Sequence, residues 1–166
     1  MNILGLSTLD PSAFGHDSSA AILDDDSNLF AISEERLSRI KHDGGYPSNS
    51  IQACLNQKNF TLSDIEHVSV GFGLEKKHMK KIMSKNFSAF AKDSGYKKTS
   101  VEKKNPIFYD HQYIHARTGL SLSGFNKAII ISLDGGGVDN GIPNSGGIFI
   151  AENGKIEPIK YFPMYH

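Results

Sequence analysis

The sequence predicts an α/β fold in which one supersecondary unit occurs twice. A short apolar run at 3–7, a loop rich in glycine and aspartate, and two further apolar segments at 18–35 open the chain. The same order of strand, glycine-rich loop and hairpin returns at 127–161. Segments of helical composition separate the two copies, and strands that alternate with helices are typical of α/β proteins.

This repeat favours a duplicated fold. We expect a first half over 1–126 and only the first strands of a second half over 127–166. A single complete domain of mixed topology is the alternative, and the pattern of elements alone leaves it open.

The elements of the first half follow from periodicity and turn chemistry. Two apolar segments at 18–23 and 28–35 flank an acidic turn, which is the pattern of a β-hairpin. A helix is expected from Ser48, because apolar residues recur there at three- and four-residue spacing after a proline. Alternating residues predict a strand at 67–73, and helical spacing predicts a helix at 75–94.

The second group of elements begins with a brief strand at 107–109 and a helix at 111–122. The strand at 127–133 is almost continuously apolar, so we expect it in the centre of a sheet. A loop is expected over 134–145. The dipeptide Asn153-Gly154 then predicts a tight hairpin turn.

Composition excludes several classes of protein. Lys+Arg and Asp+Glu both count 18, so no global charge indicates a nucleic-acid partner, and we interpret the lysine-rich stretch at 76–104 as a solvated face. The single cysteine, Cys54, excludes an internal disulfide framework and a multi-cysteine zinc site. No apolar run approaches the roughly 18 residues of a membrane span, and the N-terminus lacks the pattern of a signal peptide. We therefore expect a cytoplasmic protein without a membrane partner.

The motif GHDSSAAI at 15–22 is the first that carries chemistry. Its histidine, His16, can act as a base or orient a substrate hydroxyl, because an imidazole nitrogen can accept or donate a proton. The alternative is a histidine that merely caps the hairpin loop.

The motif SEERLSRIKHDGGYP at 33–47 gathers cations beside a glycine-rich turn. Arg39, Lys41 and His42 suit a phosphate or a carboxylate-like leaving group, which makes them candidate substrate-binding residues. The competing interpretation is a solvated helix start with offset charges.

The motif HQYIH places His111 and His115 at positions i and i+4 of an expected helix. Both imidazoles then project from one face, the geometry with which a helix supplies two nitrogen ligands to a divalent metal. Gln112 stands where a zinc-protease motif has glutamate, which argues against peptide hydrolysis. Asp134, at the end of a strand, is the candidate third ligand.

The motif SLDGGGVDNG at 132–141 follows the apolar strand. Three consecutive glycines, Gly135, Gly136 and Gly137, permit a close approach of the backbone to a ligand. Successive backbone N–H groups there can form a concave site for phosphate oxygens. A flexible linker is the alternative.

In this order and spacing, ILGLS, GHDSSAAIL, SEERLSRIKHDGGYP, the HxxxH helix and LDGGG resemble the N-terminal part of the O-carbamoyltransferase family, whose members decorate antibiotics and nodulation factors. The layout is also similar to the actin-like (ribonuclease H-like) ATPase superfold, and to the enzymes that transfer threonylcarbamoyl groups to tRNA. The resemblance runs from about Ile3 to Ile150.

The resemblance implies a two-step reaction. Carbamoyl phosphate and ATP form carbamoyladenylate in a second, C-terminal domain, and the actin-like part moves the carbamoyl group to a hydroxyl of a small-molecule acceptor. It further implies iron or zinc at His111, His115 and Asp134, the acceptor hydroxyl beside His16, and the nucleotide phosphates at the glycine run.

Two expectations concern these 166 residues by themselves. They lack a carbamoyladenylate-forming domain, so we expect no transfer activity from them alone. An uncovered apolar sheet should also lead them to form a homo-oligomer. A tRNA-modifying enzyme and a non-catalytic nucleotide- or metal-binding module remain the alternative functions.

Overall fold

The computed structural model describes residues 1–7, 16–71 and 106–164. Contacts divide this part of the chain after Phe108 into two compact units, which are described separately below. The helix expected over 75–94 and the lysine-rich stretch lie outside the described residues. The predicted boundary at 126/127 separates the two halves of a proposed duplication, which is a different division from that into compact units. This boundary stays a prediction.

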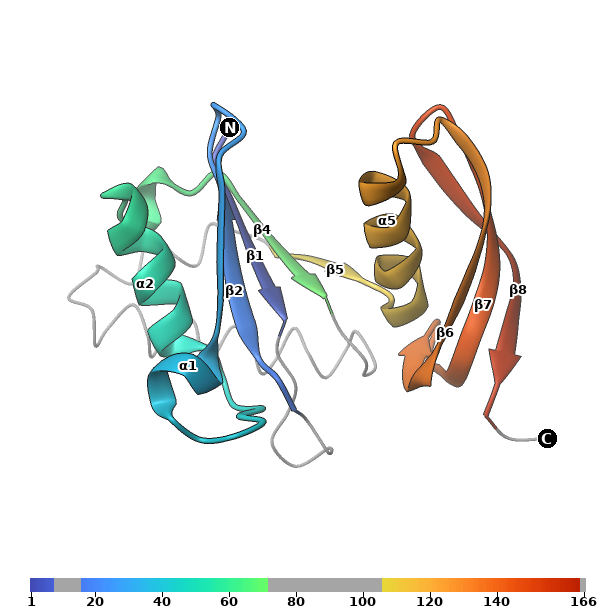
Figure 1. The fold of residues 1–166 in the computed structure, drawn as a ribbon, viewed down its shortest axis with the longest axis horizontal. Coiled ribbons are helices and arrows are strands. Elements are labelled where there is room, and N and C mark those ends of the chain that lie inside the picture. Colours follow the sequence, from blue (N-terminus) through green and yellow to red (C-terminus); the bar gives the residue numbers. More distant parts are fainter. Residues whose placement is uncertain (8–15, 72–105, 165–166) are drawn as a thin grey trace. The chain divides into compact units, whose positions relative to one another are not determined.

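The first unit is built on a five-stranded sheet with the order β3-β2-β1-β4-β5 (Figure 1). β1 pairs with β2 in antiparallel and with β4 in parallel orientation, and β2 and β3 form the predicted hairpin. The strands are β1 (Ile3–Ser7), β2 (Ser19–Leu23), β3 (Leu29–Ser33), β4 (His67–Gly71) and β5 (Ile107–Tyr109).

The core of this unit follows from strand alternation. Leu4 lies opposite Ile22 on β2 and Val68 on β4, and all three are buried. Because side chains on one face recur every second residue, the three strands present one continuous apolar face. The helices α1 (Glu34–Ser38) and α2 (Ser48–Lys58) and the short 3-10 helix η1 (Leu62–Asp64) complete the unit, with α2 against β2 and β3. The helix expected from Ser48 is confirmed.

Glu34 fixes the start of α2. Its buried carboxylate accepts hydrogen bonds from the backbone N–H groups of Asn49 (3.1 Å) and Ser50 (2.8 Å). These N–H groups have no partner inside the helix, so a carboxylate there stabilises the helix start.

The second unit is a helix packed on an antiparallel meander of order β6-β7-β8. Its elements are α5 (His111–Ser123), β6 (Lys127–Asp139), β7 (Ile142–Glu152) and β8 (Lys155–Pro163). Both hairpin turns are Asn-Gly pairs with positive φ, 53° and 79° at Asn140-Gly141 and 50° and 79° at Asn153-Gly154. Two positive φ angles in succession are the signature of the expected tight turn, so the prediction at Asn153-Gly154 is confirmed.

Two expectations about β6 are wrong. The loop predicted over 134–145 is strand, because β6 pairs with β7 as far as Asp139 and accommodates the glycines in a bulge between Leu133 and Gly137. β6 is also an edge strand of the described sheet rather than a central one. Glycine permits the irregular backbone of a bulge without ending the strand.

Alternation along β6 separates an apolar face from the face that carries the motif. Ile129, Ile131 and Leu133 are 71%, 63% and 71% exposed. Ser132, between them, is buried, and Asp134 is half-buried. The side of the sheet covered by α5 holds the second core, made of Ala116, Phe149, Ala151 and Ile156 with partly buried neighbours.

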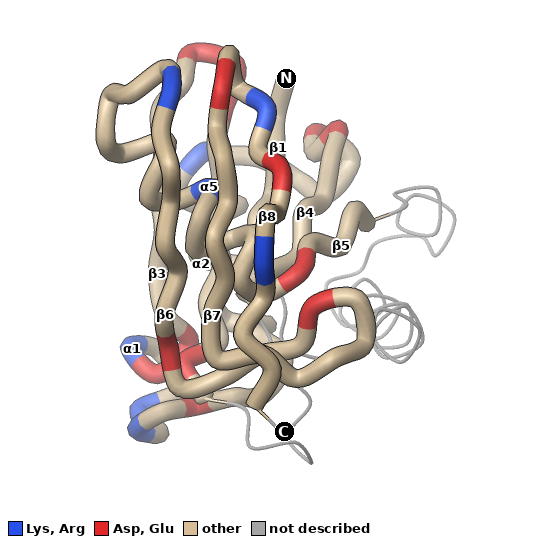
Figure 2. The backbone as a smooth tube through the Cα atoms, turned by 90° about the vertical axis from the view of Figure 1, so that its right-hand side faces the viewer, with Lys and Arg blue, Asp and Glu red and all other residues tan. Residues whose placement is uncertain are grey.

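Charged residues of both signs are interspersed along the strands of the second unit (Figure 2). Within the part of the chain that the structure describes, no helix has the length and apolar character needed to cross a membrane.

Candidate functional site

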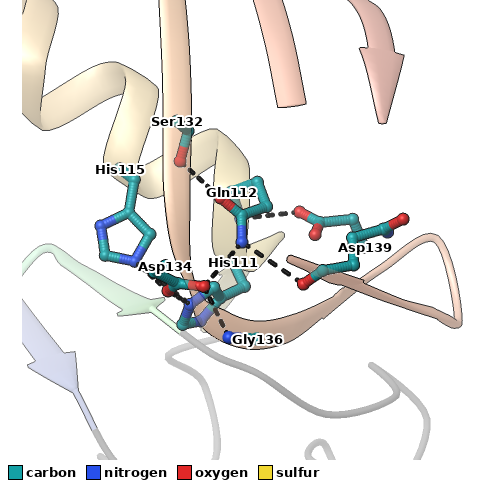
Figure 3. Close-up of polar contacts among 8 residues, drawn as sticks. His111, Gln112, His115, Ser132, Asp134, Gly136 and Asp139 are labelled. Carbon is teal, nitrogen blue, oxygen red and sulfur yellow. Dashed lines mark hydrogen bonds and ion pairs between the residues drawn. The ribbon is translucent and has the colours of Figure 1, made fainter. Parts of the chain in front are cut away.

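Three predicted ligands meet where α5 begins beside β6 (Figure 3). His111 Nε2 lies 2.5 Å and His115 Nε2 lies 2.8 Å from the same atom, Asp134 Oδ2. The two imidazole nitrogens are 3.1 Å apart. The one-turn spacing on α5 places the two rings on one face of the helix, and the alternation of β6 turns Asp134 toward them.

The other oxygen of Asp134 is occupied by the protein itself. Asp134 Oδ1 accepts hydrogen bonds from the Gly136 backbone N–H (2.7 Å) and from Gln112 Nε2 (3.0 Å). Burial opposes ionisation of this carboxyl group, but hydrogen bonds from His111, Gly136 and Gln112 outweigh it and lower the pKa of Asp134 to about 2. Asp134 is therefore a carboxylate at neutral pH, as a metal ligand must be.

Gln112 is completely buried behind the three ligands. Its Oε1 accepts a short hydrogen bond from the Ser132 hydroxyl, and its Nε2 lies 3.5 Å from the Asn144 carbonyl oxygen in addition to Asp134. The side chain thus bridges α5, β6 and β7.

Asp139, at the end of β6, holds the first turn of α5. Its Oδ1 accepts a hydrogen bond of 2.8 Å from the Gln112 backbone N–H. Burial raises the pKa of Asp139 above its ordinary value. Asp134 and Asp139, at the two ends of the glycine segment, therefore both accept hydrogen bonds from the first turn of α5.

The three glycines have different surroundings. A Cβ on Gly137 would collide with the ring of His111, and a Cβ on Gly136 would come within 2.7 Å of the Met164 sulfur. A Cβ on Gly135 would meet nothing within 4 Å. The close approach of His111 to the backbone is therefore one reason for glycine at 137, independent of any phosphate.

The donor set fits a divalent metal. The metal-binding atoms of His111, His115 and Asp134 all lie within 4.8 Å of one another. Two imidazole nitrogens and one carboxylate oxygen are ligands that zinc accepts, and three protein ligands leave positions open for substrate, as in catalytic zinc sites. The assignment of a metal to this site stays a prediction.

A second cluster lies on the first unit, where Asp17 joins two histidines. Asp17 Oδ2 is 2.7 Å from His16 Nδ1, and Asp17 Oδ1 is 2.9 Å from His42 Nδ1. Hydrogen bonds from His42 and His16 lower the pKa of Asp17. Glu35 accepts a hydrogen bond of 3.0 Å from the His42 backbone N–H. A carboxylate that accepts at Nδ1 leaves Nε2 of a neutral imidazole free to accept a proton.

The structure thus brings His16 and His42 together through Asp17. Arg39 and Lys41 are exposed on the same segment, and Arg39 forms the left-handed C-cap of α1, with a φ of 63°. Their predicted substrate role stays a prediction.

Asp17 and Gln112 contact the predicted site residues but are absent from the candidates predicted from the sequence. The position of Asp17 next to His16 is a signal that could have identified it, since a carboxylate commonly orients a histidine. In the sequence, Gln112 is notable only because it occupies the glutamate position of a zinc-protease motif. Its burial depends on packing that the sequence does not show.

Comparisons with known proteins identify relatives. Residues 2–72 match the family model described as "Carbamoyltransferase N-terminus". Nodulation protein NolNO of Sinorhizobium fredii is 30% identical over 92% of this chain and 24% of its own length. The uncharacterized protein MJ1051 of Methanocaldococcus jannaschii is 35% identical over 74% of this chain and 21% of its own length. The chain therefore spans about a quarter of the length of these relatives.

Solved structures agree on the fold. YeaZ from Pseudomonas aeruginosa matches 98% of this chain and 66% of its own chain with a TM-score of 0.57 at 13% identity. An uncharacterized protein with similarity to peptidase YEAZ from Pseudomonas aeruginosa gives a TM-score of 0.58 at 14% identity. At such identities the likeness concerns the fold, and the expected actin-like (ribonuclease H-like) fold is confirmed.

The family match lies on the first unit, and the NolNO similarity continues through the helix and strands that carry the histidine–aspartate cluster. On this evidence the first unit is similar to the N-terminal part of carbamoyltransferases, and the similarity to nodulation protein NolNO extends over 92% of the chain.

Proposed function

We propose that the chain is the metal- and acceptor-binding part of an enzyme that transfers a carbamoyl group from carbamoyladenylate to a hydroxyl of a small molecule. The observation that carries the proposal is the match of residues 2–72 to the carbamoyltransferase N-terminus. The clustering of His111, His115 and Asp134 supports it independently, because a metal held there would act as a Lewis acid on the carbamoyl oxygen.

In this proposal His111, His115 and Asp134 would hold iron or zinc. Such an ion supplies Lewis-acid polarisation of a carbonyl oxygen. The chain's own contribution would be to direct two imidazole nitrogens and one carboxylate oxygen at a single point.

His16 is proposed as the base for the acceptor. Its Nδ1 is engaged by Asp17, so Nε2 is the nitrogen that takes the hydroxyl proton. The acceptor oxygen then forms a bond to the carbamoyl carbon, the bond from that carbon to the phosphate oxygen breaks, and AMP leaves with the electron pair.

The nucleotide phosphates are proposed to lie along the glycine segment. Gly135 has open space around it, whereas the Gly136 N–H already donates to Asp134 and Gly137 packs against His111. The open space at Gly135 supports this residue as the point where the phosphates would approach the run. Arg39, Lys41 and His42 are proposed to bind the acceptor or the leaving group.

The first step, in which ATP and carbamoyl phosphate form carbamoyladenylate, is assigned to a further domain of the complete enzyme. A cytoplasmic location belongs to the same proposal, because the reaction consumes ATP.

The test is an assay of the complete enzyme with ATP, carbamoyl phosphate and a panel of hydroxyl-bearing small molecules. We expect His16→Asn to lower carbamoyl transfer by about 10²–10⁴-fold, because the hydroxyl loses its base, while carbamoyladenylate still forms. His67→Asn, which changes an exposed histidine on β4, is the matched control. Absence of any carbamoylated product would overturn the function, and equal loss of both steps would overturn the role of His16.

A further inference from the structure

We propose that Gln112 is a positioning residue that makes Asp134 a one-oxygen ligand and directs that oxygen at the two imidazoles. The inference rests on the metal centre of the proposed function and assigns a role to a residue that lies outside the ligand set. It follows from the burial of Gln112 and from the polarity of its contacts (Figure 3).

The contacts of Gln112 determine which way its amide points. An ionised carboxylate can only accept hydrogen bonds, so the amide nitrogen has to face Asp134 Oδ1, at 3.0 Å. The amide oxygen then faces Ser132, whose hydroxyl is able to donate to it. In the reverse orientation the amide oxygen of Gln112 would face the carboxylate oxygen Oδ1 of Asp134. Two acceptors would then lie side by side without a hydrogen between them, and burying them costs free energy.

In this orientation the two carboxylate oxygens of Asp134 have different partners. Oδ1 accepts from Gln112 and from the Gly136 N–H, whereas Oδ2 lies within 2.8 Å of both imidazole nitrogens. Oδ2 alone therefore faces the metal position. Carboxylate ligands are commonly oriented in this way by hydrogen bonds from outside the ligand set.

The residue type at this position also follows. Glutamate has the shape of glutamine, but an ionised glutamate has no N–H to donate and would place a second negative charge beside Asp134. Glutamine is the side chain of this length that donates to the carboxylate and accepts from the Ser132 hydroxyl at once.

The experiment titrates the purified chain with Zn²⁺ in competition with a chromophoric chelator. We expect Gln112→Glu and Gln112→Met to bind Zn²⁺ about 10–100-fold more weakly than the parent. Methionine removes the donor without adding a charge, so it separates the two effects. Gln57→Glu, on the exposed side of α2, is the control for the added charge, and circular dichroism verifies that each variant is folded.

A second measurement distinguishes positioning from a purely structural role. If Gln112 acts through Asp134, then Gln112→Glu should cost much less affinity in an Asp134→Asn background, because the partner carboxylate is already gone. An equal loss in both backgrounds would overturn the inference, as would parent-like affinity in Gln112→Glu.

The Zn²⁺ titration also distinguishes an incorrect metal centre from an incorrect role of Gln112. If the parent and the His111→Ala, His115→Ala double variant take up Zn²⁺ equally weakly, the metal centre itself is wrong and this inference is wrong with it. If the parent binds, the double variant does not, and the Gln112 variants equal the parent, only the role of Gln112 is overturned.

Discussion

At the scale of single residues, the candidate metal centre depends on the lack of a side chain at Gly137. The ring of His111 occupies the space into which a side chain at 137 would project, so only glycine lets α5 come this close to β6. Gly135, two positions earlier, has no neighbour at the corresponding point. The two glycines therefore form a matched pair.

We expect Gly137→Ala to weaken Zn²⁺ binding at least about tenfold, because the new Cβ displaces a ligand ring from its position. The same variant should lower the free energy of unfolding by about 1–3 kcal/mol, the usual cost of overpacking. Chelator competition and urea unfolding measure the two effects.

Gly135→Ala is the control, since an added methyl group there enters open space. It should resemble the parent in Zn²⁺ binding. Equal Zn²⁺ affinity of the Gly137→Ala and Gly135→Ala variants would contradict the proposed tight contact between His111 and β6.

At the scale of elements, an ion pair connects the β2–β3 turn to the end of α2. Lys58 Nζ lies 2.8 Å from Asp24 Oδ2, and the two side chains are only 17% and 11% exposed. Asp24 Oδ1 also accepts a hydrogen bond of 2.8 Å from the Asn28 N–H, which shapes the turn. The hydrogen bond from Lys58, followed by that from Asn28, lowers the pKa of Asp24 to about 2.

This shift predicts how stability depends on pH. A carboxyl group whose pKa is lower in the folded chain stabilises it above the unfolded pKa, here near 3.8, and loses that contribution as the pH falls toward 2. Asp24→Asn should therefore unfold at lower urea concentration than the parent at pH 7, and the difference should shrink between pH 4 and pH 2.

Asp25→Asn supplies the comparison, because Asp25 is the exposed neighbour in the same turn. We expect its urea midpoint to follow that of the parent throughout. A difference between the parent and Asp24→Asn that stays constant from pH 7 to pH 2 would show that the ion pair is not its source.

At the scale of the whole molecule, β6 presents an apolar face that α5 does not cover. Ile129, Ile131 and Leu133 are all more than 60% exposed, and Ile150, which pairs with Ile129 on β7, is 39% exposed. Continuous apolar patches are uncommon on monomeric proteins and typically mark interfaces.

For the purified 166-residue chain we therefore expect self-association through this face. Ile131→Glu should shift the chain toward the monomer, because burying a charge in the contact is costly. Leu122→Glu, which places the same charge on an exposed apolar position of α5, should leave the association state unchanged. Light scattering and sedimentation distinguish the outcomes, and a parent chain that is monomeric at all concentrations would refute the expectation.

Features that depend on neighbours in the chain were determined by the sequence itself. The one-turn spacing of His111 and His115, the tight turn at Asn153-Gly154 and the helix that begins at Ser48 all follow from local backbone geometry. Each involves residues at most a few positions apart, so propensity and spacing suffice to predict them.

Features that depend on distant residues were decided by tertiary structure. The glycines at 135–137 lie in a bulged strand instead of a loop because pairing with β7 continues past them. The burial of Gln112, the contact of His111 with Gly137 and the meeting of Asp134 with the helix each join positions 19 to 32 residues apart. Such contacts depend on how α5 packs on β6 and β7, and local periodicity contains no information about that packing, because it specifies which faces are apolar but not which partner covers them.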